Sequence, residues 1–319
     1  MEAYRSIDKT TTKYVHDNGA ETAIKTVSGC NNILNPLTGQ LEDLTTARNK
    51  YAVFASSFVG CPMRCSFCYL TVKKCPCYSM TDREMLENLQ EALTEELKHN
   101  KELVDKYVKL SWMGMGEPLY SPTLVTLTTK RFLDWVFKND LALGLDGVDL
   151  ATIGPPGVKE WLKDFHIYDI LDNYEFNPDH KEGRSRFRLF YSLHSAYEHT
   201  RKHLIPGASK VEETFRYLNA YCLNHGLNFI VHHMFIKDVN DSDKEIWALL
   251  RLMAYAPEAE LRILRFNECD NSPYKESDKV LEITQKLSCE LEKVKFQISV
   301  GSEIKSACGQ FILKRFVDN

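Results

Sequence analysis

Three cysteines within eight residues constrain this chain of 319 residues more than any other feature. Cys61, Cys65 and Cys68 stand four and three residues apart, so a tight loop can point their sulfur atoms into one small volume. Iron–sulfur clusters are held by cysteine thiolates and normally take four, and no fourth cysteine at a fitting place is evident. Three ligands on a four-iron cluster leave one iron open to a small molecule. The alternative is a zinc site, which needs four nitrogen or sulfur ligands and could also draw on Cys75 and Cys77.

The composition is that of an ordinary globular protein. Hydrophobic residues make up 44% of the chain and charged residues 26%, and the formal net charge is -4. This negative net charge argues against a protein whose entire surface is basic and attracts nucleic acid. Ten cysteines without a signal peptide indicate reduced thiols in the cytoplasm. No apolar run approaches the roughly 20 residues of a membrane span, so we expect a cytoplasmic protein with no membrane partner.

Strand and helix patterns alternate along most of the chain. The predicted strands cover 51–57, 107–112, 147–151, 188–193, 227–236, 261–266 and 295–300, and helices of 12–17 residues separate most of them. Such alternation implies parallel strands with right-handed crossovers. We therefore expect an α/β fold, a partial (β/α)6 barrel over residues 51–319, with its chemistry at the carboxyl ends of the strands. Residues 21–50 are predicted to form a small N-terminal β-extension, and the polar residues 1–20 a flexible N-terminus.

Four predicted strands are followed by residues that could contact a ligand or take part in chemistry. Met113–Pro118 follows the second strand, where its glycines allow close approach of the backbone to a ligand and Glu117 can pair with an ammonium group. A tight turn closed by proline is the alternative. Ser192–His194 ends the fourth strand and Asn267 follows the sixth, where they could contact a ligand. Cys308 follows the last strand, although a lone cysteine is usually an inert apolar residue.

Taken in order, these segments resemble the RlmN/Cfr family of radical S-adenosylmethionine (SAM) enzymes, which methylate carbon 2 or carbon 8 of an adenosine in RNA. The spacing of the three cysteines is the signature of the radical SAM superfamily. The matching segments are 55–61, 113–119, 192–194, 239–242 and 307–310. The resemblance implies a [4Fe–4S] cluster on Cys61, Cys65 and Cys68, with SAM bound to the open iron. An electron from the cluster would cleave SAM to a 5′-deoxyadenosyl radical.

The resemblance also implies a role for individual residues. Gly116 and Glu117 would contact the amino group of SAM, Ser192, Leu193 and His194 its ribose and carboxylate side, and Asn267 its adenine. Ala151 stands where the family has a serine that contacts SAM. Cys308 would accept a methyl group from one SAM, and a radical from a second SAM would take hydrogen from it. Glu42 is the nearest residue by spacing to the general base of the family.

The sequence departs from the family at Phe54, which replaces the second catalytic cysteine, and about 20 polar residues stand where the family has an N-terminal RNA-binding domain.

The first hypothesis is a C-methyltransferase that transfers a methyl-derived carbon from methylated Cys308 to an sp2 carbon of a nucleotide or small RNA. Flavodoxin or ferredoxin would be the reductant. The second is hydrogen abstraction from a peptide or metabolite without methyl transfer. The third is a zinc-dependent RNA-binding protein, in which basic residues between Lys181 and Lys210 grip phosphates; these residues could equally form a solvated face.

Overall fold

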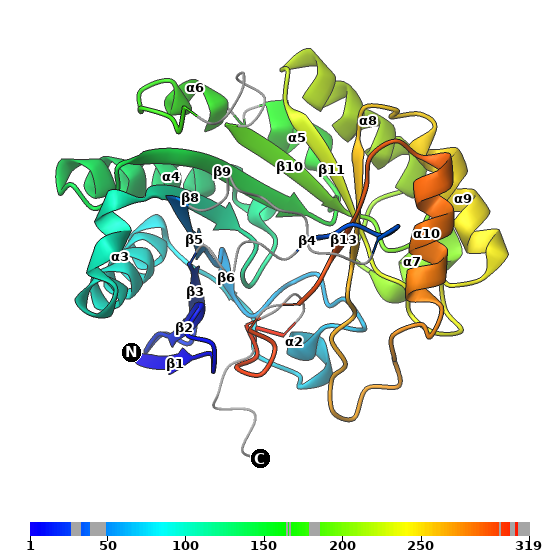
Figure 1. Cartoon of the computed structure of the whole chain (residues 1–319), viewed down its shortest axis with the longest axis horizontal. Helices are drawn as coiled ribbons and strands as arrows, with labels where there is room; N and C mark the ends of the chain where they lie inside the picture. Colours follow the sequence, from blue (N-terminus) through cyan, green and yellow to red (C-terminus); the bar gives the residue numbers. More distant parts are fainter. Residues whose placement is uncertain are drawn as a thin grey trace.

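Parallel strands form the centre of the molecule (Figure 1). The computed structural model describes residues 1–26, 33–38, 49–163, 165, 167–178, 186–299, 301–306 and 310–311. Within these ranges, seven strands pair in sequence order, each parallel to the next: β5 (Lys50–Phe54), β8 (Tyr107–Trp112), β9 (Gly144–Thr152), β10 (Phe187–Ser192), β11 (Asn228–His233), β12 (Glu260–Leu264) and β13 (Val294–Gln297). This arrangement confirms the predicted partial α/β barrel.

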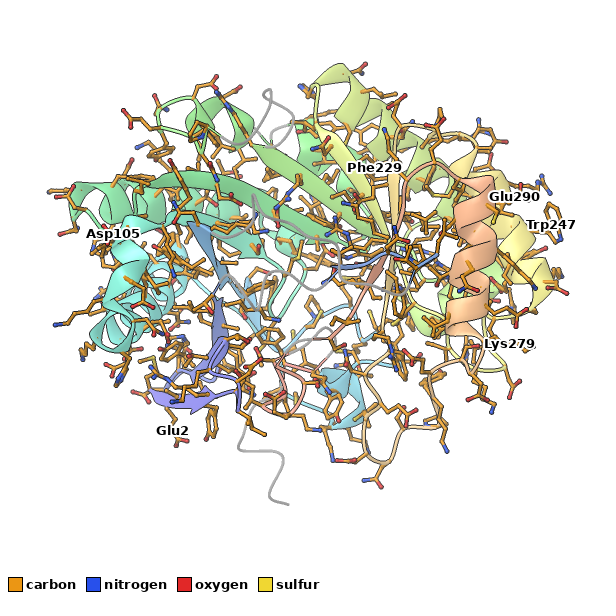
Figure 2. All side chains as sticks on the ribbon, in the orientation of Figure 1. Glu2, Asp105, Phe229, Trp247, Lys279 and Glu290 are labelled. Atoms are coloured by element: carbon orange, nitrogen blue, oxygen red, sulfur yellow. The ribbon has the colours of Figure 1, made fainter. Side chains whose placement is uncertain are left out.

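Helices cover the outer face of this sheet. The longer ones are α3 (Asp82–His99), α4 (Pro122–Lys138), α8 (Val211–Asn224), α9 (Asp243–Met253) and α10 (Val280–Glu290). Shorter ones are α2 (Tyr69–Val72), α5 (Val158–Lys163), α6 (Ile167–Leu171), α7 (Glu198–Leu204), and the 3-10 turns η2 (Lys101–Asp105) and η3 (Pro118–Tyr120). Each long helix buries one apolar face: in α9, Ile246 and Leu249 are buried, whereas Trp247 points outward into solvent (Figure 2).

The N-terminal extension flanks both edges of the parallel sheet. The strand β3 (Glu21–Lys25) pairs antiparallel with β5, and β4 (Ile33–Leu34) pairs antiparallel with β13. The extension thus contributes a strand beside the first barrel strand and another beside the last one. Glu42 lies outside the described residues.

The prediction that residues 1–20 are a flexible N-terminus is wrong. Strands β1 (Glu2–Arg5) and β2 (Thr11–Val15) form an antiparallel hairpin, and β2 continues the sheet beside β3. Tyr14 is fully buried, and its hydroxyl donates to Glu96 of α3 at 2.5 Å. The polar composition of this segment is misleading because its charges have partners: the Lys13 ammonium lies 3.3 Å from the carboxylate of Glu21.

No helix in the described part of the chain combines the length and the hydropathy that crossing a bilayer requires.

Candidate active site

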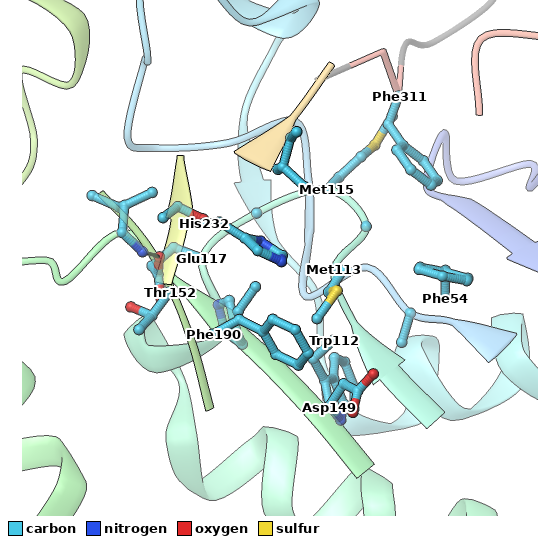
Figure 3. Close-up of a pocket in the computed structure, with 18 of the residues that line it drawn as sticks. Phe54, Trp112, Met113, Met115, Glu117, Asp149, Thr152, Phe190, His232 and Phe311 are labelled. Carbon is cyan, nitrogen blue, oxygen red and sulfur yellow. Dashed lines mark hydrogen bonds between the residues drawn. The ribbon is translucent and has the colours of Figure 1, made fainter. Parts of the chain in front are cut away.

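A cavity of about 450 Å³ lies inside the barrel at the carboxyl ends of the parallel strands (Figure 3). Its volume is in the range of small-molecule sites, about 300–1,000 Å³. Eight of the residues expected to bind the cluster or SAM line it together: Cys61, Cys65, Cys68, Gly116, Glu117, Ala151, Ser192 and His194. The fold therefore brings together residues that lie as much as 133 positions apart in the sequence, from 61 to 194.

The cysteine loop is fixed across the mouth of the barrel. The short strands β6 (Phe58–Val59) and β7 (Tyr78–Ser79) pair on either side of it. The amide of Ser66 donates to the carbonyl of Leu204 at 2.8 Å, and Cys65 and Phe67 pack against an apolar cluster at the ends of β11 and β12. At Gly60, with φ +73°, a Cβ atom would stand 2.1 Å from the carbonyl oxygen of Pro76, so only glycine fits there.

The three cysteines are not joined by disulfides to any residue that the structure describes. Burial raises the pKa of the Cys61 and Cys65 thiols, and the neighbouring thiols raise it further. Iron bound at these sulfur atoms would favour their thiolate form. Among all the described residues, no three His, Cys, Asp or Glu side chains are grouped closely enough to hold a single metal ion. A cubane places each thiolate on a different iron, so its ligands need not converge on one point. The donor set fits a cluster.

Glu117 is a buried carboxylate at the mouth of the cavity. One of its oxygens accepts from the amide of Ile153 at 2.9 Å and the other from the amide of Leu119 at 3.1 Å, and Thr152 lies beside it (Figure 3). Burial raises its pKa to about 7, and hydrogen bonds from Ile153, Thr152 and Leu119 oppose this rise. No described cationic side chain lies within ion-pair distance of this carboxylate, so it fits an ammonium group of a ligand.

Four polar atoms in the cavity wall have no hydrogen-bond partner among the described residues. They are Ser57 Oγ, His194 Nδ1, His232 Nε2 and Ser306 Oγ, all on residues at most 7% exposed. Buried polar atoms without partners are rare in folded proteins and indicate a place for a ligand or water. Burial and the neighbouring His233 and Arg201 lower the pKa of His194, which keeps its ring neutral.

Not all of the residues expected to contact SAM line the cavity, and the glycines after β8 also serve local packing. Gly114 and Gly116 pack against residues 55–58: a Cβ on Gly116 would stand 2.6 Å from Ser57 Oγ. Glycine is therefore needed at both positions so that the loop after β8 can pack against residues 55–58. Leu193 is fully buried and Asn267 half-buried, and neither is among the residues that line the cavity. Cys308 lies outside the described residues. Phe54, in the position of the family's second cysteine, lines the cavity, with Lys25 Nζ 5.1 Å from its ring centroid.

Arg201 has a role that sequence reasoning missed. The sequence places it among basic residues that could grip phosphates, but it is 1% exposed. Its guanidinium donates to the carbonyls of Ile153 at 2.5 Å and Ser192 at 2.9 Å, and also to Leu193. It therefore ties the carboxyl ends of β9 and β10 together beneath the cavity mouth. Nothing in its local sequence distinguishes it from the exposed Lys202 that follows it.

Comparisons with known proteins point to one group. The chain is 27% identical over 269 residues to the probable dual-specificity RNA methyltransferase RlmN of Clostridioides difficile, covering 82% of this chain and 69% of that protein. It is 28% identical to the dual-specificity RNA methyltransferase RlmN of Solidesulfovibrio magneticus, covering 84% and 70%. The crystal structure of a radical SAM methyltransferase from Sphaerobacter thermophilus superposes with a TM-score of 0.68 at 19% identity, covering 97% of this chain and 80% of that one. No protein-family model matches the chain.

Proposed function

This chain is a homologue of the RlmN-type RNA methyltransferases, and we propose that it is itself a radical SAM methyltransferase that modifies an sp2 carbon of an adenosine-type nucleotide or RNA. The observation that carries the proposal is the joint presence, in one barrel cavity, of three loop cysteines and a buried carboxylate without a described cationic partner. The RNA substrates named for the relatives support the substrate class.

Each residue has a proposed task. Cys61, Cys65 and Cys68 hold a [4Fe–4S] cluster, which when bound supplies the electron that cleaves SAM. Glu117 holds the SAM ammonium group and orients the molecule. The polar atoms of Ser57 and His194 bind its other polar groups, and Gly116, Ala151 and Ser192 line the same pocket. In addition, Leu193 helps to fix the end of β10, because its backbone carbonyl accepts a hydrogen bond from Arg201.

The proposal extends to residues outside the described part of the chain. Cys308 carries the methyl group and Glu42 is the general base. Among the described residues, Asn267, three residues after the end of β12, contacts the adenine. A flavodoxin or ferredoxin supplies electrons. An adenine carbon is a poor nucleophile, so attachment of the transferred carbon to a protein sulfur lets it be positioned against the ring.

Mass spectrometry tests this proposal. Anaerobically reconstituted protein is incubated with SAM and a reductant, and the peptide that contains Cys308 is analysed. We expect a gain of one methyl group on Cys308, with 5′-deoxyadenosine and S-adenosylhomocysteine as co-products. The Cys308→Ala variant is the control and should form no S-adenosylhomocysteine. An unmodified Cys308 during turnover would contradict methyl transfer.

One observation favours the second candidate function, hydrogen abstraction without methyl transfer. Phe54 fills the cavity wall where a resolving cysteine would be needed to release a covalently attached product. In that case 5′-deoxyadenosine forms without S-adenosylhomocysteine, so the same experiment separates the two functions.

A further inference from the structure

The inner wall of the cavity contains a histidine to which the proposed function gives no task. His232 lies in β11, where it pairs with Ser192 of β10 on one side and with Arg262 of β12 on the other, and all three residues line the cavity. Barrels of this type usually fill their interior with Val, Ile and Leu. His232 is therefore an unusual interior residue, and it lies beside Ser192, which we assign to the SAM pocket.

His232 and the histidine that follows it have different surroundings, because successive residues of a strand point to opposite faces. The ring of His232 lies in the cavity, with its centroid 4.8 Å from that of Phe190 (Figure 3). His233 is 1% exposed, its ring centroid lies 4.6 Å from that of Phe235, and it is not among the residues that line the cavity. Only the first of the two histidines can thus contact a ligand there.

The Nε2 atom of His232 is buried and makes no hydrogen bond with any described residue, and the residue as a whole is 7% exposed. Burial and the neighbouring Arg262 lower the pKa of this histidine to about 3, against an opposing effect of Asp149. The ring is therefore neutral near pH 7, and Nε2 is available to donate or to accept one hydrogen bond. A buried polar atom without a partner costs free energy that a bound ligand recovers.

Flat side chains surround this nitrogen. Phe190 is 2% exposed and lines the cavity, and the guanidinium carbons of Arg188 and Arg262 lie 5.9 and 5.4 Å from its ring centroid. Asp149 holds the guanidinium of Arg188, and Glu260 holds that of Arg262, each through the Nε and Nη2 atoms. A wall of aromatic rings and fixed guanidinium planes that contains one free ring nitrogen matches a flat heterocycle better than a sugar or an aliphatic chain.

We propose that His232 recognises the nucleobase of the substrate, with its Nε2 atom hydrogen-bonded to an edge atom of the base and the base packed against Phe190. The inference rests on the proposed function for the class of substrate, and adds which residue distinguishes the base. Adenine has ring nitrogens that accept and a 6-amino group that donates, so a neutral imidazole can pair with either kind of atom. His232 is then a specificity-determining residue.

Calorimetry on the anaerobically reconstituted full chain tests this contact, with S-adenosylhomocysteine present at saturation so that the SAM pocket is filled. The probes are adenosine, its 1-deaza, 3-deaza and 7-deaza analogues, and purine riboside, which lacks the 6-amino group. Each analogue removes one hydrogen-bonding group from the edge of the base. We expect adenosine to bind, and at least one analogue to bind about tenfold more weakly, the effect of one buried hydrogen bond.

Substitutions of His232 then connect this loss to its Nε2 atom. His232→Leu should weaken adenosine binding about tenfold, yet leave unchanged the binding of the analogue that lacks the contacted atom. His232→Gln retains a hydrogen-bonding group on a side chain of similar length and should keep most of the affinity. His233→Leu is the matched control and should bind adenosine as the wild type does, because His233 is adjacent and also buried but does not line the cavity.

The inference is overturned if adenosine does not bind, if every analogue binds as adenosine does, or if folded His232→Leu binds adenosine like the wild type. It is also overturned if His232→Leu loses as much affinity for SAM as for adenosine, which would assign the nitrogen to the SAM pocket. Should His232→Leu not fold, His232→Phe keeps a flat ring without the nitrogen and is measured with the same expectations.

Failure of the methyltransferase proposal is seen separately. It would appear as protein that binds adenosine through His232 but forms no S-adenosylhomocysteine when incubated with SAM and a reductant.

Discussion

The side-chain amide of Asn240 donates a hydrogen bond to the backbone carbonyl of His194, with 2.5 Å between the two atoms. The same amide donates to the carbonyl of Met234 at 2.8 Å, and its oxygen accepts from the amide of Ile236 at 2.6 Å. Asn240 is fully buried, and His194 has a φ of 55°, in the left-handed region that few residues other than glycine adopt. Asn240 therefore holds the end of β10 in the conformation that places His194 in the cavity wall.

Asn240→Ala should destabilise the protein and weaken SAM binding together. Three buried hydrogen bonds are lost and their backbone partners are left unsatisfied, so we expect a loss of about 3 kcal/mol in the free energy of unfolding. Urea unfolding of the wild type and the variant measures this quantity. The exposed Asn139→Ala, at the end of α4, is the control. A change below about 0.5 kcal/mol would contradict the role given to Asn240.

Glu117→Gln should lower the affinity for SAM by about 10- to 100-fold, because a buried carboxylate that pairs with an ammonium group loses its charge. The amide keeps nearly the same shape, so the cluster content should not change. Calorimetry with SAM measures the affinity. Glu245→Gln is a matched control, since Glu245 is also buried but does not line the cavity. Equal losses in both variants would show that the effect is structural.

The affinity for SAM should depend on pH through Glu117. Burial raises the pKa of this carboxyl to about 7 in the ligand-free protein, and only its ionised form pairs with an ammonium group. Affinity should therefore level off above about pH 8 and fall about tenfold for each unit below about pH 6. The contribution of Glu117 to folding has the opposite sign: it is present below the ordinary pKa of Glu and is lost as the pH rises through about 7. In Glu117→Gln the pH dependence of SAM affinity should disappear, and its persistence would assign the titration to another group.

Tyr14→Phe tests whether the N-terminal hairpin is part of the folded domain. The buried hydroxyl donates to Glu96, so its removal should cost about 1–2 kcal/mol of unfolding free energy. Thermal or urea unfolding measures this cost, and Tyr255→Phe, at an exposed ring, is the control. If Tyr14→Phe is as stable as the control, the hairpin does not stabilise the barrel.

Local patterns were sufficient to predict much of the fold. Apolar runs separated by amphipathic segments predict the parallel strands and their helices, because strands such as β5, β9 and β11 are buried over most of their length. The capping box of α3 is visible in the sequence, since Thr81 and Glu84 are only three residues apart, and both of its hydrogen bonds form. The three cysteines and Glu117 could be assigned to one site because both of their segments follow strands whose ends meet.

What could not be predicted depends on contacts between distant segments. Asn240 and His194 are separated by 46 residues, and the local sequence of neither indicates the other. Polar residues in β2 suggested a flexible end because their partners, Glu21 and Glu96, were not known. Arg188 appeared to belong to a surface patch, and only the register of β10 against β9 shows that it points into the barrel beside Asp149.

Reductive cleavage of SAM tests the central claim most directly. Wild-type protein purified and reconstituted without oxygen is incubated with SAM and dithionite, and 5′-deoxyadenosine is quantified by mass spectrometry. Cys65→Ser removes one loop cysteine, and Cys222→Ser removes a buried cysteine that does not line the cavity. The account predicts 5′-deoxyadenosine from the wild type and from Cys222→Ser, and none from Cys65→Ser. Absence of 5′-deoxyadenosine from iron-loaded wild-type protein, or equal amounts from both variants, would contradict it.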